Sequence, residues 1–225
     1  MTFARRAWII LWKDLLTERR SKESLNALFF FALLLLFLFE FALGPDRERL
    51  VAVLPGLLWL GFILAGLLAL GRTFIVEREN DCWEGLVLTA GDKGAIYLGK
   101  LAGNFLLMAA VEVVLLSLFG IFYNVDLWPS LAPLSLVILL GTVGLAAVGT
   151  LFGAMTSQLR ARELLFPLLL LPVQVPVLLG TVKATEAVFQ GLALADVGHW
   201  LKLLAAADLV YLLVGLLTFE FILEA

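Results

Sequence analysis

Residues 50–71 read LVAVLPGLLWLGFILAGLLALG, a stretch without a single charged side chain. A helix needs about 20 mostly apolar residues to cross the hydrocarbon core of a bilayer. The apolar residues follow one another continuously and do not alternate with polar ones, as they would in a strand of a membrane β-barrel. The stretch therefore predicts a transmembrane helix.

Five further stretches have the same character, and they are 25–43, 101–123, 131–155, 164–182 and 203–223. Across the chain, 62% of the residues are hydrophobic, 16% are charged, and the mean hydropathy is +1.03. A soluble domain carries about 25% charged residues. We therefore expect an all-α integral membrane protein in which residues 1–225 form one transmembrane domain with six membrane-spanning helices.

The charge, cysteine and histidine content excludes several classes of protein. A net charge of −3 does not favour binding to nucleic acid. Cys82 is the single cysteine and cannot form an internal disulfide, and a single histidine, His199, excludes a metal site built from several histidines. The HExxH and GxSxG patterns are absent, and no second acid is placed to pair with Glu112, so an intramembrane hydrolase is not supported and no catalytic residue is assigned.

Lysine and arginine are unevenly distributed between the two sides of the predicted spans. The side of the N-terminus holds twelve and the other side holds four, counted over 1–24, 72–100 and 156–163 against 44–49, 124–130 and 183–202. Cytoplasmic loops carry the excess of positive charge, so both termini are predicted to be cytoplasmic. The N-terminal residues carry charges throughout, and they do not show the pattern of a cleaved signal peptide.

Residues 3–20, within the N-terminal segment 1–24, combine apolar and basic side chains at helical spacing. The apolar set includes Trp8 and Trp12, and basic side chains such as Arg5 and Arg19 lie between them. This pattern predicts an amphipathic helix on the cytoplasmic surface of the lipid bilayer, with the tryptophans at the level of the headgroups. The alternative is a basic segment that only sets the orientation of the chain.

Among the polar side chains inside the predicted spans, Glu112 and Gln174 are the candidate site residues, and Asp208 makes the start of the last span the least certain. An acid in the membrane is costly, so Glu112 is expected to face the helix bundle or another subunit, in a substrate path or a subunit contact. The alternative is a protonated carboxyl group that is hydrogen-bonded to a neighbour such as Ser117 or Gln174.

Small residues recur in the second and fourth spans, and prolines interrupt the fifth. Gly149 and Gly153 form a GxxxG pattern, which lets helices approach closely either within one chain or across a homodimer. Pro167, Pro172 and Pro176 remove backbone donors and are expected to kink or break their helix.

Two features look like ligand sites, and a plainer interpretation is favoured for each. Residues 94–100, GAIYLGK, match part of a phosphate-binding loop, but Leu101 stands where the metal-binding serine or threonine belongs. His199 is the one candidate haem ligand, yet a histidine beside Trp200 is also typical of a membrane interface. We therefore expect no tightly bound cofactor and no metal.

Four stretches in order along the chain read LGPD at 43–46, LPGLLWL at 54–60, ERENDCWEGLVLTAGDKGAIYLGKL at 77–101 and PLLLLPVQVPVLLG at 167–180. In these four stretches the chain resembles the CcmB family, the permease subunit of the ABC transporter of cytochrome c maturation. It departs from the family pattern at Gly71 and over residues 81–83, while residues 84–86 agree with it.

The resemblance implies an ABC-2-exporter-like permease that has no ATPase site of its own and lies in a bacterial inner membrane. A CcmA-like ABC ATPase subunit would bind ATP, and a CcmC-like membrane protein would handle haem, the implied substrate. The permease would couple ATP hydrolysis to haem export or to release of a haem-loaded periplasmic carrier. A permease for lipids, glycans or drugs, or a scaffold without a transport role, would share the architecture.

The charged stretch 77–88, within the cytoplasmic segment 72–100, is predicted to form a short coupling helix that docks on the ATPase. Its aromatic and aliphatic side chains fall on one helical face, and its acids lie near the helix start, where the backbone dipole favours them. An apolar anchor with a charged rim is typical of a protein contact. The predicted contact residues are Glu77, Arg78, Glu79, Trp83, Glu84, Gly85, Leu86 and Val87. The alternative is a solvated loop.

The charge distribution predicts the topology of the chain. A reporter that is active only outside the cytoplasm is expected to be silent when it is fused after Ala225 and active when it is inserted at Asn124. The opposite pattern of activity would overturn the orientation.

Overall fold

The computed structural model describes residues 2–21, 23–44, 47–79, 82–83, 85, 92–125, 127–192 and 194–224. This part of the chain contains helices and no strand. The elements are α1 (Phe3–Ser21), α2 (Glu23–Leu43), α3 (Arg47–Arg72), α4 (Ile75–Glu79), α6 (Gly94–Phe122), the 3-10 helix η1 (Trp128–Ser130), α7 (Leu131–Ser157), α8 (Arg162–Phe189) and α9 (Leu194–Glu224).

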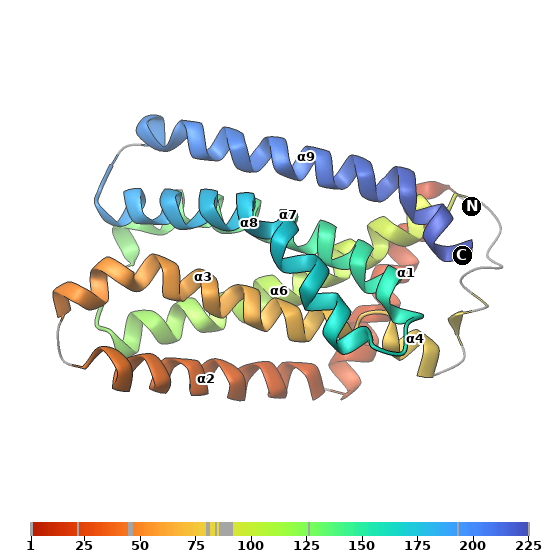
Figure 1. The fold of residues 1–225 in the computed structure, drawn as a ribbon, viewed down its shortest axis with the longest axis horizontal. Coiled ribbons are helices and arrows are strands. Elements are labelled where there is room, and N and C mark those ends of the chain that lie inside the picture. Colours follow the sequence, from red (N-terminus) through yellow and green to blue (C-terminus); the bar gives the residue numbers. More distant parts are fainter. Residues whose placement is uncertain are drawn as a thin grey trace.

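The long helices lie side by side in one elongated bundle, and the two chain termini and α4 lie at the same end of it (Figure 1). Helix α7 packs against α3, α6, α8 and α9. Helix α2 covers α3 and α6 from the outside, and α1 lies against α6. The arrangement places the basic N-terminal segment and the start of the charged segment 72–100 at one end, as the distribution of lysine and arginine predicts.

Five helices are long and apolar enough to cross a membrane, and their ranges are Ala52–Arg72, Gly94–Phe122, Trp128–Ser157, Arg162–Phe189 and Asp196–Leu223. In α2 the described apolar stretch, Leu28–Ala42, is shorter. The prediction of an all-helical integral membrane protein is thus confirmed for the described residues. The count of six spans stays a prediction, since α2 does not meet the same criterion.

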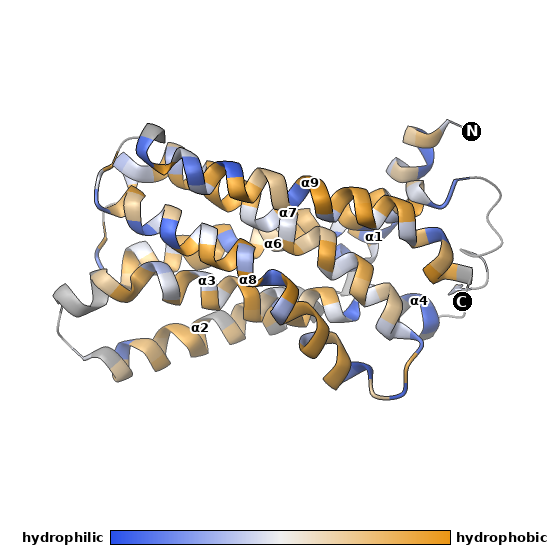
Figure 2. Ribbon diagram, turned by 45° about the horizontal axis from the view of Figure 1, so that its top comes forward, coloured by the Kyte–Doolittle hydropathy of each residue, from blue (hydrophilic) through white to orange (hydrophobic). Residues whose placement is uncertain are grey.

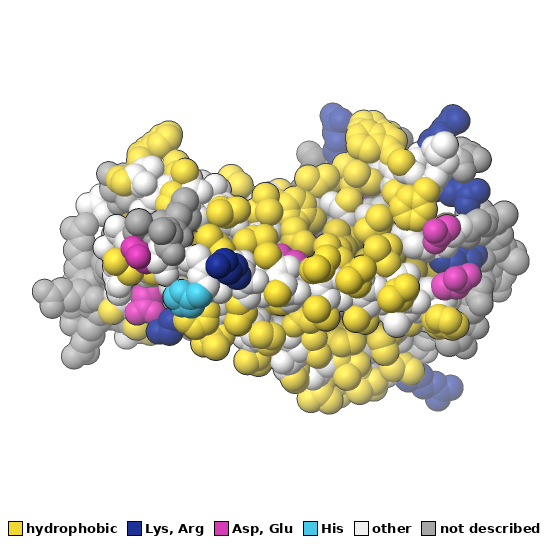
Figure 3. Space-filling model, turned by 90° about the horizontal axis from the view of Figure 1, so that it is seen from above, with side chains coloured by type: hydrophobic (Ala, Val, Ile, Leu, Met, Phe, Trp, Pro, Cys, Tyr) yellow, Lys and Arg dark blue, Asp and Glu magenta, His cyan; other side chains and the backbone are white. Residues whose placement is uncertain are grey.

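Apolar residues dominate the long helices along most of their length (Figure 2). Large side chains such as Phe41, Leu217 and Phe221 are exposed, and apolar side chains cover most of the middle of the face formed by α9 (Figure 3). Soluble monomers rarely expose apolar patches larger than a few hundred Å². This surface therefore suits contact with lipid.

Two of the helices begin earlier than the hydrophobicity of the sequence predicts. Helix α6 begins at Gly94 and not at 101, and α9 begins at Leu194 and not at 203. Asp92 Oδ1 accepts the Gly94 N–H at 2.8 Å and so satisfies one donor at the start of α6. A helix of 29 residues is about 44 Å long, against about 30 Å for the hydrocarbon core. The helices therefore continue beyond the bilayer, where hydropathy gives no signal.

Glycines of α7 allow its neighbours to approach closely within one chain. A Cβ built on Gly149 would lie 2.4 Å from Leu70 Cδ1, and one on Gly141 would lie 2.3 Å from Cη2 of Trp59. The indole of Trp59 is buried, and its Nε1 donates to Thr185 Oγ1 at 2.9 Å. Packing inside the subunit thus explains these glycines, and a homodimer stays a prediction without support from them.

Helix α8 remains one helix from Arg162 to Phe189 through all three of its prolines. It packs against α7 and α9 along the bundle. A proline in a membrane helix is tolerated where neighbouring helices compensate for the lost backbone hydrogen bond. The expected break in this helix is therefore not found, and a kink at the prolines stays a prediction.

Gly141→Ala is expected to lower the free energy of unfolding by roughly 1–3 kcal/mol, because the methyl group would overlap the fixed indole of Trp59. Gly56→Ala is the matched control, since a Cβ at Gly56 meets no atom within 4 Å and alanine favours the helix. Thermal unfolding in detergent measures both variants. Equal stability of the two would contradict the close packing of α3 on α7.

Candidate functional site

Helix α1 lies against two glycines of α6. A Cβ on Gly99 would lie 2.7 Å from the carbonyl oxygen of Ala7, and one on Gly103 would lie 3.6 Å from Asp14 Cβ. These two glycines of α6 form a GxxxG pattern, which permits close contact between helices. The contact brings the charged side chains of α1 next to those of α6.

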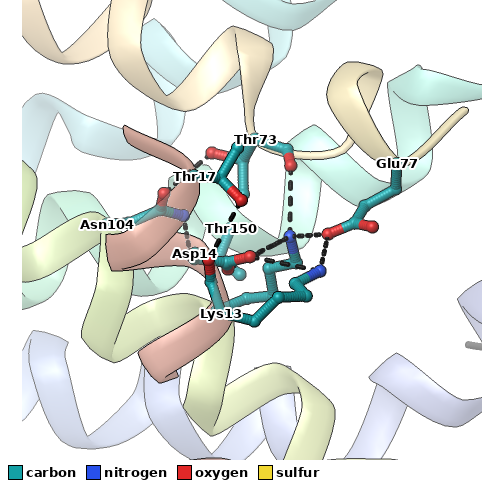
Figure 4. Close-up of polar contacts among 8 residues, drawn as sticks. Lys13, Asp14, Thr17, Thr73, Glu77, Asn104 and Thr150 are labelled. Carbon is teal, nitrogen blue, oxygen red and sulfur yellow. Dashed lines mark hydrogen bonds and ion pairs between the residues drawn. The ribbon is translucent and has the colours of Figure 1, made fainter. Parts of the chain in front are cut away.

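Four charged side chains from three helices meet beside this contact (Figure 4). Lys100 of α6 makes ion pairs with Asp14 of α1, at 3.1 Å, and with Glu77 of α4. Lys13 of α1 pairs with the same Glu77 oxygen and lies 3.3 Å from Asp14. We call Lys13, Asp14, Glu77 and Lys100 the charge cluster. It joins α1, α4 and α6 with two positive and two negative charges.

The charge cluster is deeply buried at Lys100 and Glu77, which are only 2% and 5% exposed. Burial alone would raise the pKa of Glu77, but the ammonium groups of Lys100 and Lys13 hold it below its usual value. Burial likewise opposes the charge of Lys13, but the hydrogen bond to Glu77 and the charge of Asp14 raise its pKa above the usual value. Glu77 and Lys13 therefore keep their charges at neutral pH.

A chain of hydrogen bonds leads from the charge cluster toward the centre of the bundle. Lys100 Nζ donates to the carbonyl oxygen of Thr73 at 3.4 Å, and the Thr73 hydroxyl donates to Asn104 Oδ1 at 2.8 Å. Asn104 Nδ2 donates to Thr150 Oγ1 at 2.8 Å, and Thr150 donates to the carbonyl oxygen of Ala146 at 2.7 Å. The end of α3 is thus connected through α6 to the middle of α7.

Arg78 and Trp83 attach the segment that begins with α4 to the end of the bundle. Arg78 Nη1 donates to the carbonyl oxygen of Ser157 at 3.0 Å, which satisfies an acceptor in the last turn of α7. The guanidinium carbon of Arg78 lies 5.3 Å from the centre of the Trp83 ring. The indole of Trp83 packs edge-on against Phe74, with ring centres 6.1 Å apart. Trp83 is therefore partly covered by its own chain.

The predicted helix over 77–88 is not one continuous helix, although Trp83 and Gly85 are helical, and residues 80–81, 84 and 86–88 lie outside the described residues. Helix α4 begins at Ile75 and ends at Glu79, and Cys82 lies outside any helix. The Cys82 N–H bonds to the carbonyl oxygen of Glu77 at 2.8 Å, so the chain turns after α4.

The structure separates the eight predicted contact residues into three groups. Glu77 and Arg78 face the bundle, whereas Trp83 is partly buried and Gly85 is exposed. The side chain of Glu79 is not among those described. Glu84, Leu86 and Val87 lie outside the described residues. The contact with an ATPase stays a prediction for this segment.

Glu112 is buried, and its partner is a residue that the sequence did not indicate. Thr142 Oγ1 of α7 lies 2.8 and 2.7 Å from the two carboxyl oxygens of Glu112. Ser117 donates to the carbonyl oxygen of Val113 in its own helix, and Gln174 donates to that of Gly144, so neither is the partner. The acid faces the bundle, as predicted, and joins α6 to α7.

The space beside Glu112 is small. A cavity of about 10 Å³, which is room for about one water molecule, is lined by Glu112 and by apolar side chains of α2, α3 and α6, among them Leu28, Phe62 and Met108. Ligand sites for drug-sized molecules measure about 300–1,000 Å³. In this conformation the pocket is therefore too small for a molecule of the size of haem.

His199 lies on the exposed side of α9, close to its beginning. Its ring packs against that of Trp200, with centres 4.7 Å apart. The described residues contain no group of three or more histidine, cysteine or acidic side chains that could hold a metal ion. The arrangement agrees with the interfacial interpretation of this histidine, and a role as haem ligand is not tested.

Lys100 and Asp14 were not predicted from the sequence as members of a site. Lys100 appeared there only as the end of a phosphate-loop pattern, and the structure places residues 94–100 in the first two turns of α6. A signal was present in Gly99 and Gly103, whose spacing predicts close contact with another helix. The identity of that helix could not be read from the spacing.

Comparison with known proteins identifies relatives over almost the whole chain. A family model described as CcmB protein matches residues 5–224. Heme exporter protein B of Pseudomonas aeruginosa is 34% identical over 191 residues, which is 85% of this chain and 85% of the relative. Heme exporter protein B of Paracoccus denitrificans is 33% identical over 205 residues, 90% of this chain and 91% of the relative. The protein of the same name from Haemophilus influenzae is 34% identical over 176 residues, or 75% and 76% of the two chains.

Glu77→Gln is expected to lower the melting temperature in detergent at neutral pH, because it leaves Lys13 and Lys100 with Asp14 as their only acid in the cluster. Since the pKa of Glu77 is lowered in the folded protein, the contribution of its charge to the stability of the fold is complete above the usual glutamate pKa of about 4.3. That contribution is lost as the pH falls further.

The melting temperatures of wild type and Glu77→Gln should therefore converge in acid. Glu186→Gln is the control, because Glu186 pairs with Lys183 at 2.8 Å on the exposed surface, where a pair contributes about 0–1 kcal/mol. A constant difference between wild type and Glu77→Gln at every pH would contradict the charged state of Glu77.

Proposed function

The chain belongs to the CcmB family, whose model spans residues 5–224, and on this premise we propose that it is the membrane permease of a haem exporter for cytochrome c maturation. The observation that carries the proposal is the similarity to proteins named Heme exporter protein B, which extends over 85% of both chains in the Pseudomonas aeruginosa relative. The helical bundle with an apolar outer surface agrees with a permease.

The permease works with a separate ABC ATPase subunit, CcmA-like, and a haem-handling membrane protein, CcmC-like. It lies in a bacterial inner membrane with six spans, α2 being the first, and with both termini in the cytoplasm. The gathering of both termini and α4 at one end of the bundle supports this topology (Figure 1), together with the excess of lysine and arginine in the same segments.

The segment that begins with α4 is the coupling site for the ATPase. Three contacts hold it on the bundle: Glu77 pairs with Lys13 and Lys100, Arg78 reaches the end of α7, and Trp83 packs on Phe74. A displacement of this segment by a partner therefore acts on α1, α6 and α7 at once. This is how a change in the ATPase reaches helices inside the membrane.

Haem is the substrate of the exporter, and the chain holds no cofactor of its own in this proposal. The coupled step is either movement of haem across the membrane or release of a haem-loaded periplasmic carrier. The small volume beside Glu112 belongs to a closed conformation of the exporter. Glu112 and Gln174 lie in the part of the bundle that would separate to open a path for haem.

In a host that lacks its own family member, the wild-type chain is expected to restore c-type cytochromes and to co-purify with the ATPase. Trp83→Ala removes the anchor of the coupling site and should cost about 2 kcal/mol of partner affinity, or about 30-fold. Glu84→Lys reverses a charge on the predicted rim and should weaken binding as well.

Trp128→Ala is the control, since Trp128 is a strongly exposed indole in η1, at the opposite end of the bundle. ATPase retention, ATP turnover and cytochrome content are measured at matched protein abundance. If Trp83→Ala and Glu84→Lys both retained the ATPase and supported full maturation, the segment would be a linker and not the coupling site.

A further inference from the structure

Three helices meet at Gly144 of α7, where two polar side chains converge. Gln174 Nε2 of α8 donates to the carbonyl oxygen of Gly144 at 3.0 Å. A Cβ on Gly144 would lie 2.5 Å from Asp208 Oδ1 of α9 and 3.2 Å from Val177 of α8. Only a glycine leaves room for the carboxyl group of Asp208 at this point, so the amide and the acid approach α7 at the same residue.

Contacts on both sides of this point fix how α8 and α9 lie against each other. The Tyr211 hydroxyl of α9 donates to the carbonyl oxygen of Val173 at 2.6 Å. In the other direction, a Cβ on Gly180 would lie 3.0 Å from Leu204. Val173 is the neighbour of Gln174, and Asp208 lies between Leu204 and Tyr211. The antiparallel helices therefore bring Asp208 and Gln174 to the same level of the bundle.

The site has acceptors and lacks donors. Gln174 is 0% and Asp208 is 5% exposed. Among the described residues, Gln174 Oε1 and both carboxyl oxygens of Asp208 have no hydrogen-bond partner. Buried polar atoms without partners are rare in native proteins, and each one calls for an explanation. Three such atoms, all of them oxygens, point to a missing hydrogen or cation.

The surrounding helices supply no positive charge at this level. Helix α7 contains no acidic or basic residue, and the charged residues of α8 lie near its two ends. On α6, Lys100 belongs to the charge cluster and Glu112 faces Thr142. The remaining titratable groups on the flanking parts of α6 and α9 are Tyr97, Tyr211 and Lys202, and Lys202 is exposed on the surface of the bundle. Tyr97 donates to the carbonyl oxygen of Ala147 and Tyr211 to that of Val173.

A single proton would pair two of the three oxygens in one hydrogen bond and would leave the third as an uncharged carbonyl oxygen. An ionised carboxylate without a partner in an apolar interior is very costly, and a bound water molecule would leave that charge in place. Metal cations of the hard type take about six or more oxygen ligands, and the site offers three unpartnered ones. A protonated acid needs one acceptor, which Gln174 Oε1 provides.

We propose that Asp208 and Gln174 form a proton-binding site that holds α8 and α9 on α7 at Gly144. Asp208 carries the proton and donates it to Gln174 Oε1, while Gln174 Nε2 keeps its bond to the carbonyl oxygen of Gly144. Loss of the proton leaves a carboxylate that requires water, which opens the contact between these helices. The site is separate from the coupling segment and does not depend on the identity of the exported molecule.

Infrared difference spectroscopy of the purified protein in lipid, in H₂O and D₂O, tests the proposal. The wild type minus Asp208→Asn is expected to show the C=O band of a protonated carboxylic acid, shifted in D₂O. Labelling the side-chain carboxyl of aspartate with ¹³C should move this band, whether or not the Asn variant folds. The band of Glu112 stays in place under this label, and Glu112→Gln is the control.

Gln174→Met removes the acceptor and should shift the Asp208 C=O band to higher frequency, as expected for a weaker hydrogen bond. Carboxylate bands in place of the acid band, or a band indifferent to Gln174→Met, would overturn the proposal. Thermal unfolding in sodium, potassium or choline chloride at equal ionic strength distinguishes a proton-binding site from a site for a metal cation. Stabilisation by sodium or potassium in the wild type and not in Asp208→Asn would also overturn it, because the ligand would then be a metal cation.

Discussion

The ammonium group of Lys100 is buried at one end of a membrane helix, and the arrangement of that end depends on its neutralisation. An unpaired charge in such a position is strongly destabilising, and removing one partner of a buried pair typically costs about 3–5 kcal/mol. The compensating acids come from two other segments, Asp14 of α1 and Glu77 of α4. A single requirement of electrostatics thus holds the N-terminal helix and the start of the coupling site on α6. Glycines at 99 and 103 make the approach sterically feasible.

The polar contacts continue from this end into the apolar bundle, and α7 receives most of them. Thr150 is reached through Asn104, Thr142 contacts Glu112, and Gly144 is approached by the amide of Gln174. Two of these contacts join α7 to different turns of α6, and the third joins it to α8. In an apolar solvent, hydrogen bonds and close packing replace the hydrophobic effect as the forces that set helix positions. The helix in the middle is therefore the element through which a movement of the coupling site spreads.

Long apolar runs made the membrane-spanning helices predictable, because hydropathy measures the property that the bilayer selects. The first residues of α6 and α9 were missed, since the part of a helix that extends into water has no apolar signal. The charge cluster was predicted only in part. Lys13 and Glu77 are 64 residues apart in sequence, and no local pattern reveals that such side chains meet. Glu77 was assigned to the contact with the ATPase for this reason, and the contacts of Thr142 and Asp208 became clear only when neighbouring helices were placed around them.

The most direct measurement of the central claim is hydrogen exchange of the wild type and Lys100→Met, followed by mass spectrometry. The charge cluster holds α1 and α4 on α6 at once, so removal of Lys100 should raise exchange in residues 3–21 and in 75–79 together, through local opening. Lys183→Met, which removes the exposed partner of Glu186, should change neither segment. Faster exchange confined to the neighbourhood of Lys100 in α6, with 3–21 and 75–79 unchanged, would contradict the account.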